Sequence, residues 1–183
     1  IVAFLRPISK NLGKDEEKYV KLLSKWRATN WQAYPTVFKV TEEGTRRWIK
    51  DQLINREDRI LFMIINLDNQ PIGHLGLSNF DFKKQEAEID NVVRGVSDVL
   101  PGVMAFALNV LIHWSFTTLR LRRLFLRVFS DNERAVKFYE RCGFRGVKNI
   151  PLHKVSDSEV TKYKEILPGP KILPHLVTTT GNP

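Results

Sequence analysis

Residues 90–116 constrain the fold more than any other stretch, because they combine a strand, a loop and a long apolar helix. β-Branched residues at the start suit a strand, Arg94-Gly95 interrupts it, and Pro101-Gly102 opens the helix. The first turn of a helix leaves backbone N–H groups without partners, and these groups and the helix dipole attract anions. The stretch alone fits two structures, a phosphate-binding helix start and an ordinary strand-to-helix turn.

The composition fits one compact domain, since 43% of the 183 residues are hydrophobic and 27% are charged. A formal net charge of +9 predicts an anionic partner: a phosphorylated cofactor, a nucleotide-linked substrate, nucleic acid or an acidic surface. Cys142 is the only cysteine, which excludes an internal disulfide and a cysteine metal cluster. Such a chain is expected in the cytoplasm, where thiols stay reduced.

Neither a membrane span nor a metal site is expected. The most apolar run, residues 99–116, contains Pro101, Gly102 and His113, which suits a helix in a protein core better than one in a bilayer. The spacing of histidines, cysteines and carboxylates matches no metal motif. The chain begins at Ile1 without a methionine or a signal-peptide pattern, which leaves open that it is part of a longer protein.

Hydrophobic periodicity and turn residues divide the chain into strands and helices. A continuous apolar run followed by Asp68-Asn69-Gln70 predicts an antiparallel hairpin, and Ser130 or Asp131 is expected to cap the last helix. The expected elements are a strand at 1–6, a helix at 15–29, an aromatic loop at 31–38, a helix at 42–54 capped by Thr41, strands at 60–66, 71–80 and 87–93, a helix from 101, a strand at 123–129, a helix ending at Cys142 and Gly143, and strands from Phe144 and at 160–166.

The domain is expected to end near residue 166. The segment 167–183 is rich in proline, glycine and threonine and buries little apolar surface, so it is predicted to be an extended tail or linker outside the core. Residues 1–166 then form one domain of mixed α/β class.

Four motifs stand in an order that is more specific than any one of them. They are Pro71-Ile-Gly-His-Leu-Gly, Ala87-Glu-Ile-Asp, Pro101-Gly-Val-Met and Asp131-Asn-Glu-Arg-Ala-Val-Lys-Phe-Tyr-Glu-Arg-Cys-Gly-Phe. With these motifs the chain resembles the GNAT acyltransferase superfamily over residues 4–146. The resemblance implies an α/β (α+β) fold with a mixed, mostly antiparallel central sheet flanked by about four helices.

Other residues indicate a branch of that superfamily. The opening Arg6-Pro-Ile and residues 23–27 are similar to the branch of ribosomal-protein alanine acetyltransferases, which also contains amino-sugar N-acetyltransferases. Residues 89–95 (IDNVVRG) and 149–152 (NIPL) are more similar to the amino-sugar enzymes. The resemblance implies transfer of an acetyl group from acetyl-CoA to a primary amine.

The resemblance also implies where acetyl-CoA binds. The end of the central strand is expected at the thioester, and the start of the long helix at the pyrophosphate. The family loop there usually begins with Arg or Gln and ends with Gly or Ala, whereas this chain has Val99 and Met104 at those positions. The residues expected at the cofactor are Val92, Val93, Arg94, Pro101, Gly102, Val103, Met104, Asn132 and Phe138. For Asn132 the alternative role is helix capping, and for Phe138 it is packing of the helix on the sheet.

Acetyl transfer needs a base for the amine, donors for the thioester oxygen and a donor for the leaving sulfur. By resemblance, Tyr139 is the expected general acid, since an ordinary phenol with a pKa of about 10 is protonated at neutral pH. Glu88 and Asp90 are candidate bases because they are two residues apart on a strand and share a face. His74 is a rival base or an acceptor-binding residue. The alternatives are an apolar helix face for Tyr139, a solvated strand face for the carboxylates and a structural role for His74.

The superfamily builds its acceptor pocket from the first two helices and the loop between them. Arg27 and Tyr34 are candidate acceptor-binding residues there, and an arginine suits a phosphorylated acceptor. The favoured hypothesis is a cytoplasmic N-acetyltransferase whose small-molecule acceptor is an anionic amine, in particular a nucleotide-linked amino sugar. Protein N-terminal acetylation and a noncatalytic binding module with a degenerate CoA loop are the alternatives. Nucleic acid is a disfavoured partner, and a homodimer is left open.

Overall fold

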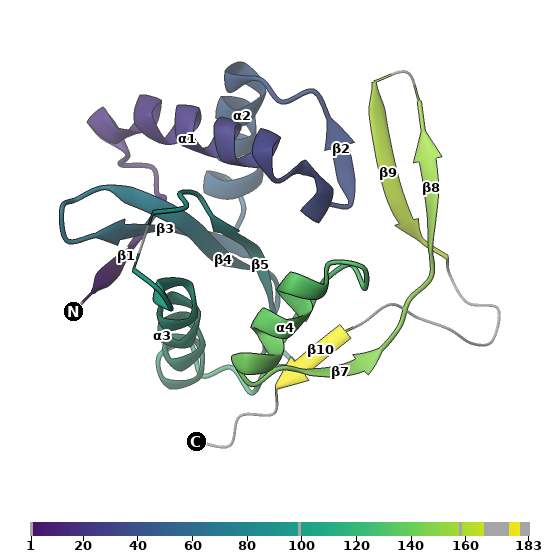
Figure 1. Ribbon diagram of the computed structural model, residues 1–183. Coiled ribbons are helices and arrows are strands. Elements are labelled where there is room, and N and C mark those ends of the chain that lie inside the picture. The colour runs from purple at the N-terminus through teal and green to yellow at the C-terminus, as the bar shows by residue number, and fades with distance from the viewer. Residues whose placement is uncertain (1, 99, 158, 167–175, 180–183) are drawn as a thin grey trace.

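The protein forms a layered α/β structure in which one sheet lies between two pairs of helices (Figure 1). The computed structural model describes residues 2–98, 100–157, 159–166 and 176–179. The main sheet has the strand order β1-β3-β4-β5-β6-β10-β7, and only the β5–β6 pair is parallel among these described strands. Its strands are β1 (Ala3–Pro7), β3 (Arg59–Asn66), β4 (Pro71–Asp81), β5 (Glu86–Arg94), β6 (Arg123–Arg127), β7 (Arg145–Lys148) and β10 (Leu176–Thr179).

Four α-helices cover this sheet, with α1 and α2 on one face and α3 and α4 on the other (Figure 1). The predicted mixed, mostly antiparallel sheet with about four helices is therefore confirmed. The helices are α1 (Glu16–Thr29), α2 (Glu42–Ile49), α3 (Val103–Thr117) and α4 (Glu133–Arg141), with a π-helical turn (Lys50–Ile54) after α2 and 3-10 turns at Gly13–Asp15 and Trp31–Ala33.

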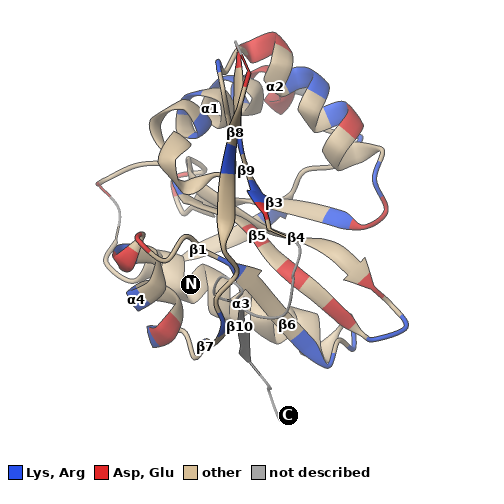
Figure 2. Cartoon of the chain, turned by 90° about the vertical axis from the view of Figure 1, so that its right-hand side faces the viewer, with Lys and Arg blue, Asp and Glu red and all other residues tan. Residues whose placement is uncertain are grey.

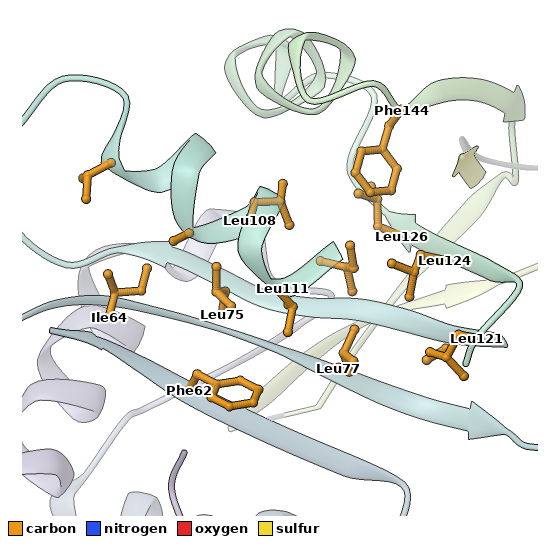
Figure 3. Packing of buried hydrophobic residues seen from close by; sticks show 14 of the residues in the cluster. Phe62, Ile64, Leu75, Leu77, Leu108, Leu111, Leu121, Leu124, Leu126 and Phe144 are labelled. Atoms are coloured by element: carbon orange, nitrogen blue, oxygen red, sulfur yellow. The ribbon is translucent and has the colours of Figure 1, made fainter. Parts of the chain in front are cut away.

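Side chains along β3 alternate between two hydrophobic cores. Leu61, Met63 and Ile65 pack with residues of α1 and α2, whereas Phe62 and Ile64 pack with residues of α3 (Figure 3). Successive side chains of a strand point to opposite faces, so a continuous apolar run predicts a strand that is covered on both sides. This double burial fixes the centre of the sheet, and side chains at the ends of its strands are held in defined positions.

The strands β5 and β6 pair only over their first residues. Their parallel register ends at Glu88↔Phe125, and beyond Glu88 the described strands pair with β5 only through β4. The β4–β5 register itself shifts between His74 and Gly76, and Asn91 adopts a positive φ of 53°. Such a bulge changes the direction of side chains, and the divergence leaves one backbone edge of β5 without a strand partner.

A second sheet has the order β2-β9-β8 and consists of β2 (Thr36–Phe38), β9 (Val160–Glu165) and β8 (Leu152–Ser156). The strand predicted at 160–166 is observed as β9, but it belongs to this second sheet and not to the main sheet. The strand β2 lies in the stretch 31–38, which was expected to be a loop. The strands β2 and β8 were not predicted, because a three-residue strand and a largely exposed one carry too little apolar alternation to be recognised in the sequence.

Part of the predicted tail belongs to the main sheet. Leu176–Thr179 forms β10 between β6 and β7, which corrects the prediction that the whole of 167–183 lies outside the core. The sequence LVTT suits a strand because its residues are largely β-branched, but four residues among prolines give a weak signal. Residues 167–175 and 180–183 of the predicted tail lie outside the described residues, as does Val99.

Helix ends follow the expected capping residues with one exception. The Thr41 side chain accepts a first-turn N–H of α2, and Gly143, with a φ of 92°, follows α4. The cap of α4 is Asn132, whose Oδ1 accepts an N–H at 3.2 Å, and neither Ser130 nor Asp131. The cap lies one or two residues later than expected because Asn132 is itself a strong capping residue.

The helix α3 is the most apolar of the chain, and it has 15 residues. Within the described residues, no helix is both long and apolar enough to cross a membrane. These residues also contain no group of three or more histidine, cysteine, aspartate or glutamate side chains that is arranged to hold a metal ion.

Candidate active site

A cavity of about 360 Å³ lies between the second sheet, helices α1 and α2, and the strands β3, β4 and β5. A space of this size can hold a small molecule. Its wall combines aromatic side chains of the α1–α2 region with charged side chains of the sheet. The charged and titratable residues in this wall are Arg27, Tyr34, Arg59, His74, Glu88, Asp90 and Arg127.

Asp90 lies in this wall at the bulge of β5, a strand with acidic residues at alternate positions (Figure 2). Its Oδ1 accepts a hydrogen bond from the backbone N–H of Asn91 at 2.7 Å, and its Oδ2 accepts one from the side-chain Nδ2 of Asn91 at 2.8 Å. The Arg59 Nη2 atom is 3.8 Å from Oδ2, which is beyond hydrogen-bond distance. The side chain is 34% exposed, so Asp90 is oriented by its neighbour and open to the cavity.

Glu88 shares this face of β5, as the two-residue spacing predicts, but its carboxylate is already paired. Arg127 Nε and Nη2 donate to Oε1 and Oε2 at 2.8 and 3.0 Å, and Asn79 Nδ2 donates to Oε2 at 2.6 Å. The Glu88 side chain is only 7% exposed. A buried carboxylate with a bidentate arginine is suited to hold structure, whereas Asp90 is free to meet an amine.

His74 lies on β4 in the cavity wall, buried and stacked on Trp26 with ring centroids 5.8 Å apart. Burial lowers its pKa to about 4, against an opposing effect of a backbone hydrogen bond with Asn91. The imidazole is therefore neutral at physiological pH. These properties suit a structural residue of the cavity floor better than a base.

Arg27 and Tyr34 meet in the cavity wall, where the sequence predicted an acceptor pocket. The Arg27 guanidinium carbon is 3.3 Å from the centre of the Tyr34 ring, and Nη2 donates to the Thr36 carbonyl at 2.5 Å. Burial lowers the pKa of Arg27 and raises that of Tyr34 to about 12, so Arg27 remains charged and Tyr34 neutral. The hydrogen bond to Thr36 links β2 to α1, and the stacked guanidinium presents a positive charge to the cavity.

Tyr139 lies on α4, on the other side of the sheet from the acceptor cavity, and its ring makes edge contacts with Phe138 and Phe144. Burial raises its pKa above the ordinary value of a phenol, and the charge of Asp90 raises it further. The phenol is therefore a permanent hydrogen-bond donor at physiological pH.

The start of α3 has the features of an anion site. Gly102 caps the helix with a φ of 82°, and the N–H groups of Met104 and Ala105 have no acceptor within the described residues. The Met104 side chain packs against the core, and its sulfur lies 3.4 Å from the position that a Cβ on Gly73 would take. Met104 therefore points away from the free N–H groups, and they remain available to a pyrophosphate.

The other residues expected at the cofactor surround this helix start. Val92 and Val93 direct their side chains into the two cores, which leaves their backbone on the unpaired edge of β5. Arg94 Nε donates to the Val96 carbonyl at 2.9 Å and Nη2 donates to the Ser97 carbonyl, so this side chain braces the loop before α3. Pro101 is exposed and Val103 is buried.

Asn132 directly precedes α4 as its N-cap, and Phe138 lies within this helix. The Asn132 side chain caps the helix, and Phe138 is partly buried against the core that α3 shares with the sheet. The alternative roles considered for both residues are thus observed, and their contact with a cofactor stays a prediction. The free N–H groups of α3 and the open edge of β5 fit a phosphorylated, extended ligand such as CoA.

Three polar residues of the cavity wall, Arg59, Asn79 and Arg127, were not expected from the sequence. Their roles depend on contacts across strands, which a sequence does not specify. Arg127 gave one signal, since it interrupts the apolar strand RLFLRVF, and a charge inside such a strand needs a partner.

Solved structures with this fold include two acetyltransferases. The spermidine N-acetyltransferase of Vibrio cholerae in complex with CoA and spermine is 17% identical, with a TM-score of 0.68 over 97% of this chain and 94% of that chain. The N-acetyltransferase PseH of Campylobacter jejuni in complex with acetyl coenzyme A is 19% identical, with a TM-score of 0.63 over 99% and 100% of the two chains. At these identities the likeness establishes the fold alone.

Sequence comparison identifies the family. No curated protein matches the chain at a significant level. A family model described as the acetyltransferase (GNAT) domain matches residues 3–145, which include the motifs, α3 and α4. The chain therefore belongs to the GNAT acetyltransferase family and is, as the ordered motifs predict, an acetyl-CoA-dependent N-acetyltransferase.

Proposed function

We propose that the protein acetylates the primary amine of a small anionic acceptor, with a nucleotide-linked amino sugar as the favoured compound. The cavity beside Asp90 carries this proposal, because its wall holds three arginines and two carboxylates. Since His74 is neutral, the residues that line the cavity carry one positive charge in excess, while Glu165, outside this lining, also pairs with Arg127. Such a wall favours an anionic acceptor and disfavours a polyamine.

The donor side of the site is assigned to the start of α3 and the open edge of β5. When bound, acetyl-CoA supplies an acetyl group activated as a thioester. The free N–H groups of Met104 and Ala105 are suited to its pyrophosphate, and Gly102 allows close approach of the ligand to the backbone. The backbone of Val92, Val93 and Arg94 is suited to the thioester oxygen and the pantetheine arm.

Asp90 is proposed as the group that binds the acceptor amine and accepts its proton, directly or through a water molecule. It is the partly exposed carboxylate of the cavity, whereas Glu88 is paired with Arg127. Loss of the amine proton allows the new N–C bond to form while the C–S bond breaks.

Tyr139 is proposed as the donor to the leaving sulfur. A thiol has an ordinary pKa of about 8.5, so a phenol whose pKa is raised by burial is the weaker acid of the two. Full proton transfer from Tyr139 is therefore unfavourable. A hydrogen bond from its O–H stabilises the developing thiolate without that cost.

The test compares acceptors of different charge under one set of conditions. The protein is mixed with acetyl-CoA and an amino-sugar nucleotide, spermidine or a peptide with an N-terminal alanine, and both thiol release and product mass are measured. We expect the amino-sugar nucleotide to give the highest kcat/KM. Preference for spermidine would refute the anionic acceptor, and preference for the peptide would favour N-terminal acetylation. Absence of acetyl-CoA binding at millimolar concentration would instead favour a noncatalytic module.

A further inference from the structure

Two of the three arginines in the cavity wall are committed to protein partners. Arg27 stacks on Tyr34 and donates a hydrogen bond to a backbone carbonyl. Arg127 binds both carboxylate oxygens of Glu88 and also donates to Glu165 at 3.1 Å. Their contacts explain why these cations are stable in a partly buried site.

Arg59 lacks such partners. Within the described residues its side chain makes no hydrogen bond, the Nε atom is buried without an acceptor, and the one ion pair of the side chain is the 3.8 Å contact with Asp90. The side chain is only 22% exposed. A guanidinium has five N–H donors, and a largely buried one is costly unless they are satisfied. An uncommitted arginine in the wall of a cavity indicates a missing anionic ligand.

The backbone holds Arg59 firmly in this position. It is the first residue of β3 and lies opposite Ser78 of β4, which in turn lies opposite Glu88 of β5. All four of Arg59, Ser78, Glu88 and Asp90 line the same cavity. The guanidinium is therefore presented beside the proposed base by three paired strands of the main sheet.

We infer that Arg59 binds an anionic group of the acceptor, a phosphate or a carboxylate that is separated from the reacting amine by only a few bonds. This inference rests on the proposed function, because it assigns the amine to Asp90. The short span follows from the 3.8 Å between the Arg59 and Asp90 side chains. The planar guanidinium can contact two oxygens of one anion, which a lysine at this position cannot do.

The alternative is that Arg59 serves only as a counter-ion that positions Asp90. The two roles differ in their consequences for different acceptors. A counter-ion affects every acceptor through Asp90, whereas an anion-binding residue affects only acceptors that carry the anion. Acceptors that share one amine and differ in their anion therefore separate the two roles.

The experiment uses Arg59→Gln and Arg59→Lys with glucosamine, glucosamine 1-phosphate, glucosamine 6-phosphate and alanine as acceptors. We expect Arg59→Gln to raise KM for glucosamine 1-phosphate roughly tenfold to hundredfold, as the loss of charged hydrogen bonds does. KM for glucosamine and for acetyl-CoA should stay unchanged, and Arg59→Lys should restore only part of the affinity. A selective effect on alanine would identify a carboxylate, and one on the phosphosugars a phosphate.

The matched control is Arg56→Gln. Arg56 precedes β3, forms an exposed pair with Asp58 at 2.6 and 2.7 Å, and lies outside the cavity wall. This variant should behave as wild type with every acceptor. An equal change in kcat/KM for glucosamine and glucosamine 1-phosphate in Arg59→Gln would overturn the inference, as would equal KM values for these two acceptors in the wild type.

A binding measurement separates this inference from the proposed function. Calorimetry with glucosamine 1-phosphate in the presence of CoA, which carries no acetyl group, reports acceptor binding without turnover. Wild-type binding that Arg59→Gln abolishes supports the anion site even when no acetyl transfer is found. Acetyl transfer to glucosamine without any binding of the phosphorylated sugar refutes the anion site and leaves the N-acetyltransferase intact.

Discussion

Removing the charge of Arg127 should destabilise the protein, because this residue is the main partner of the buried Glu88. Arg127→Met keeps much of the aliphatic stem but leaves the carboxylate with one side-chain donor, Asn79, within the described residues. Breaking a fully buried ion pair costs about 3–5 kcal/mol. Arg127 is 51% exposed, which reduces the expected loss to about 2 kcal/mol.

Thermal unfolding followed by circular dichroism measures this loss. For a domain of this size about 2 kcal/mol corresponds to a decrease in Tm of roughly 4–8 °C. The double variant Glu88→Gln with Arg127→Met should recover most of the stability, since no unpaired carboxylate remains. The control is Lys137→Met, which removes an exposed pair with Glu133 and should change the free energy of unfolding by less than about 0.5 kcal/mol.

The same variants decide the role of Glu88 in catalysis. If Glu88 is structural, Glu88→Gln changes Tm more than kcat, whereas loss of a general base lowers kcat by about 10²-fold to 10⁴-fold. An unchanged Tm in Arg127→Met would refute the assignment of this pair as a stabilising contact.

Three further changes test other parts of the site. Tyr139→Phe should lower kcat about tenfold or more without changing either KM, because it removes only the proposed donor to sulfur, and unchanged turnover would exclude Tyr139 from the mechanism. The folded His74 has a pKa of about 4, below the ordinary 6.5, so the unfolded chain binds its proton first as the pH falls. The free energy of unfolding should therefore be unaffected by His74 above about pH 6.5 and should fall towards pH 4 by at most about 1.4 kcal/mol per pH unit. Urea unfolding at several pH values measures this loss, and His74→Gln should remove it. Gly102→Ala places a side chain at a φ of 82°, which costs about 1 kcal/mol and should raise KM for acetyl-CoA with KM for the acceptor unchanged; equal increases in both KM values would argue against the pyrophosphate assignment.

The fold was largely predictable because long periodic segments dominate it. The apolar run at 60–66, the helical spacing at 15–29 and the capping residue Thr41 each specify their structure locally. The strands β2 and β10 were not predictable, since each is short and is stabilised by pairing with residues far away in the sequence. Local sequence carries no information on such pairing.

The candidate site was predictable only where one element defines it. Period-two spacing correctly placed Glu88 and Asp90 on one face, but it could not distinguish them. That distinction depends on Arg127, which is 39 residues from Glu88 along the chain. The role of Arg59 could not be predicted for the same reason. It follows from the lack of a hydrogen-bond acceptor around its side chain, which only the folded structure shows.

One departure of the phosphate loop from its family pattern, Met104, is compatible with an anion site because of the direction of its side chain, whereas Val99 lies outside the described residues. A pattern that ends in Gly or Ala suggests that a large residue there would block the phosphate. Met104 avoids this conflict, because its side chain packs towards Gly73 and the core while its N–H faces the other way. A Cβ at residue 73 would be excluded by the Val93 carbonyl oxygen, 2.5 Å from its position, and would lie 3.4 Å from the Met104 sulfur, which is an ordinary contact. The anion site therefore depends on backbone groups that the Met104 side chain leaves free.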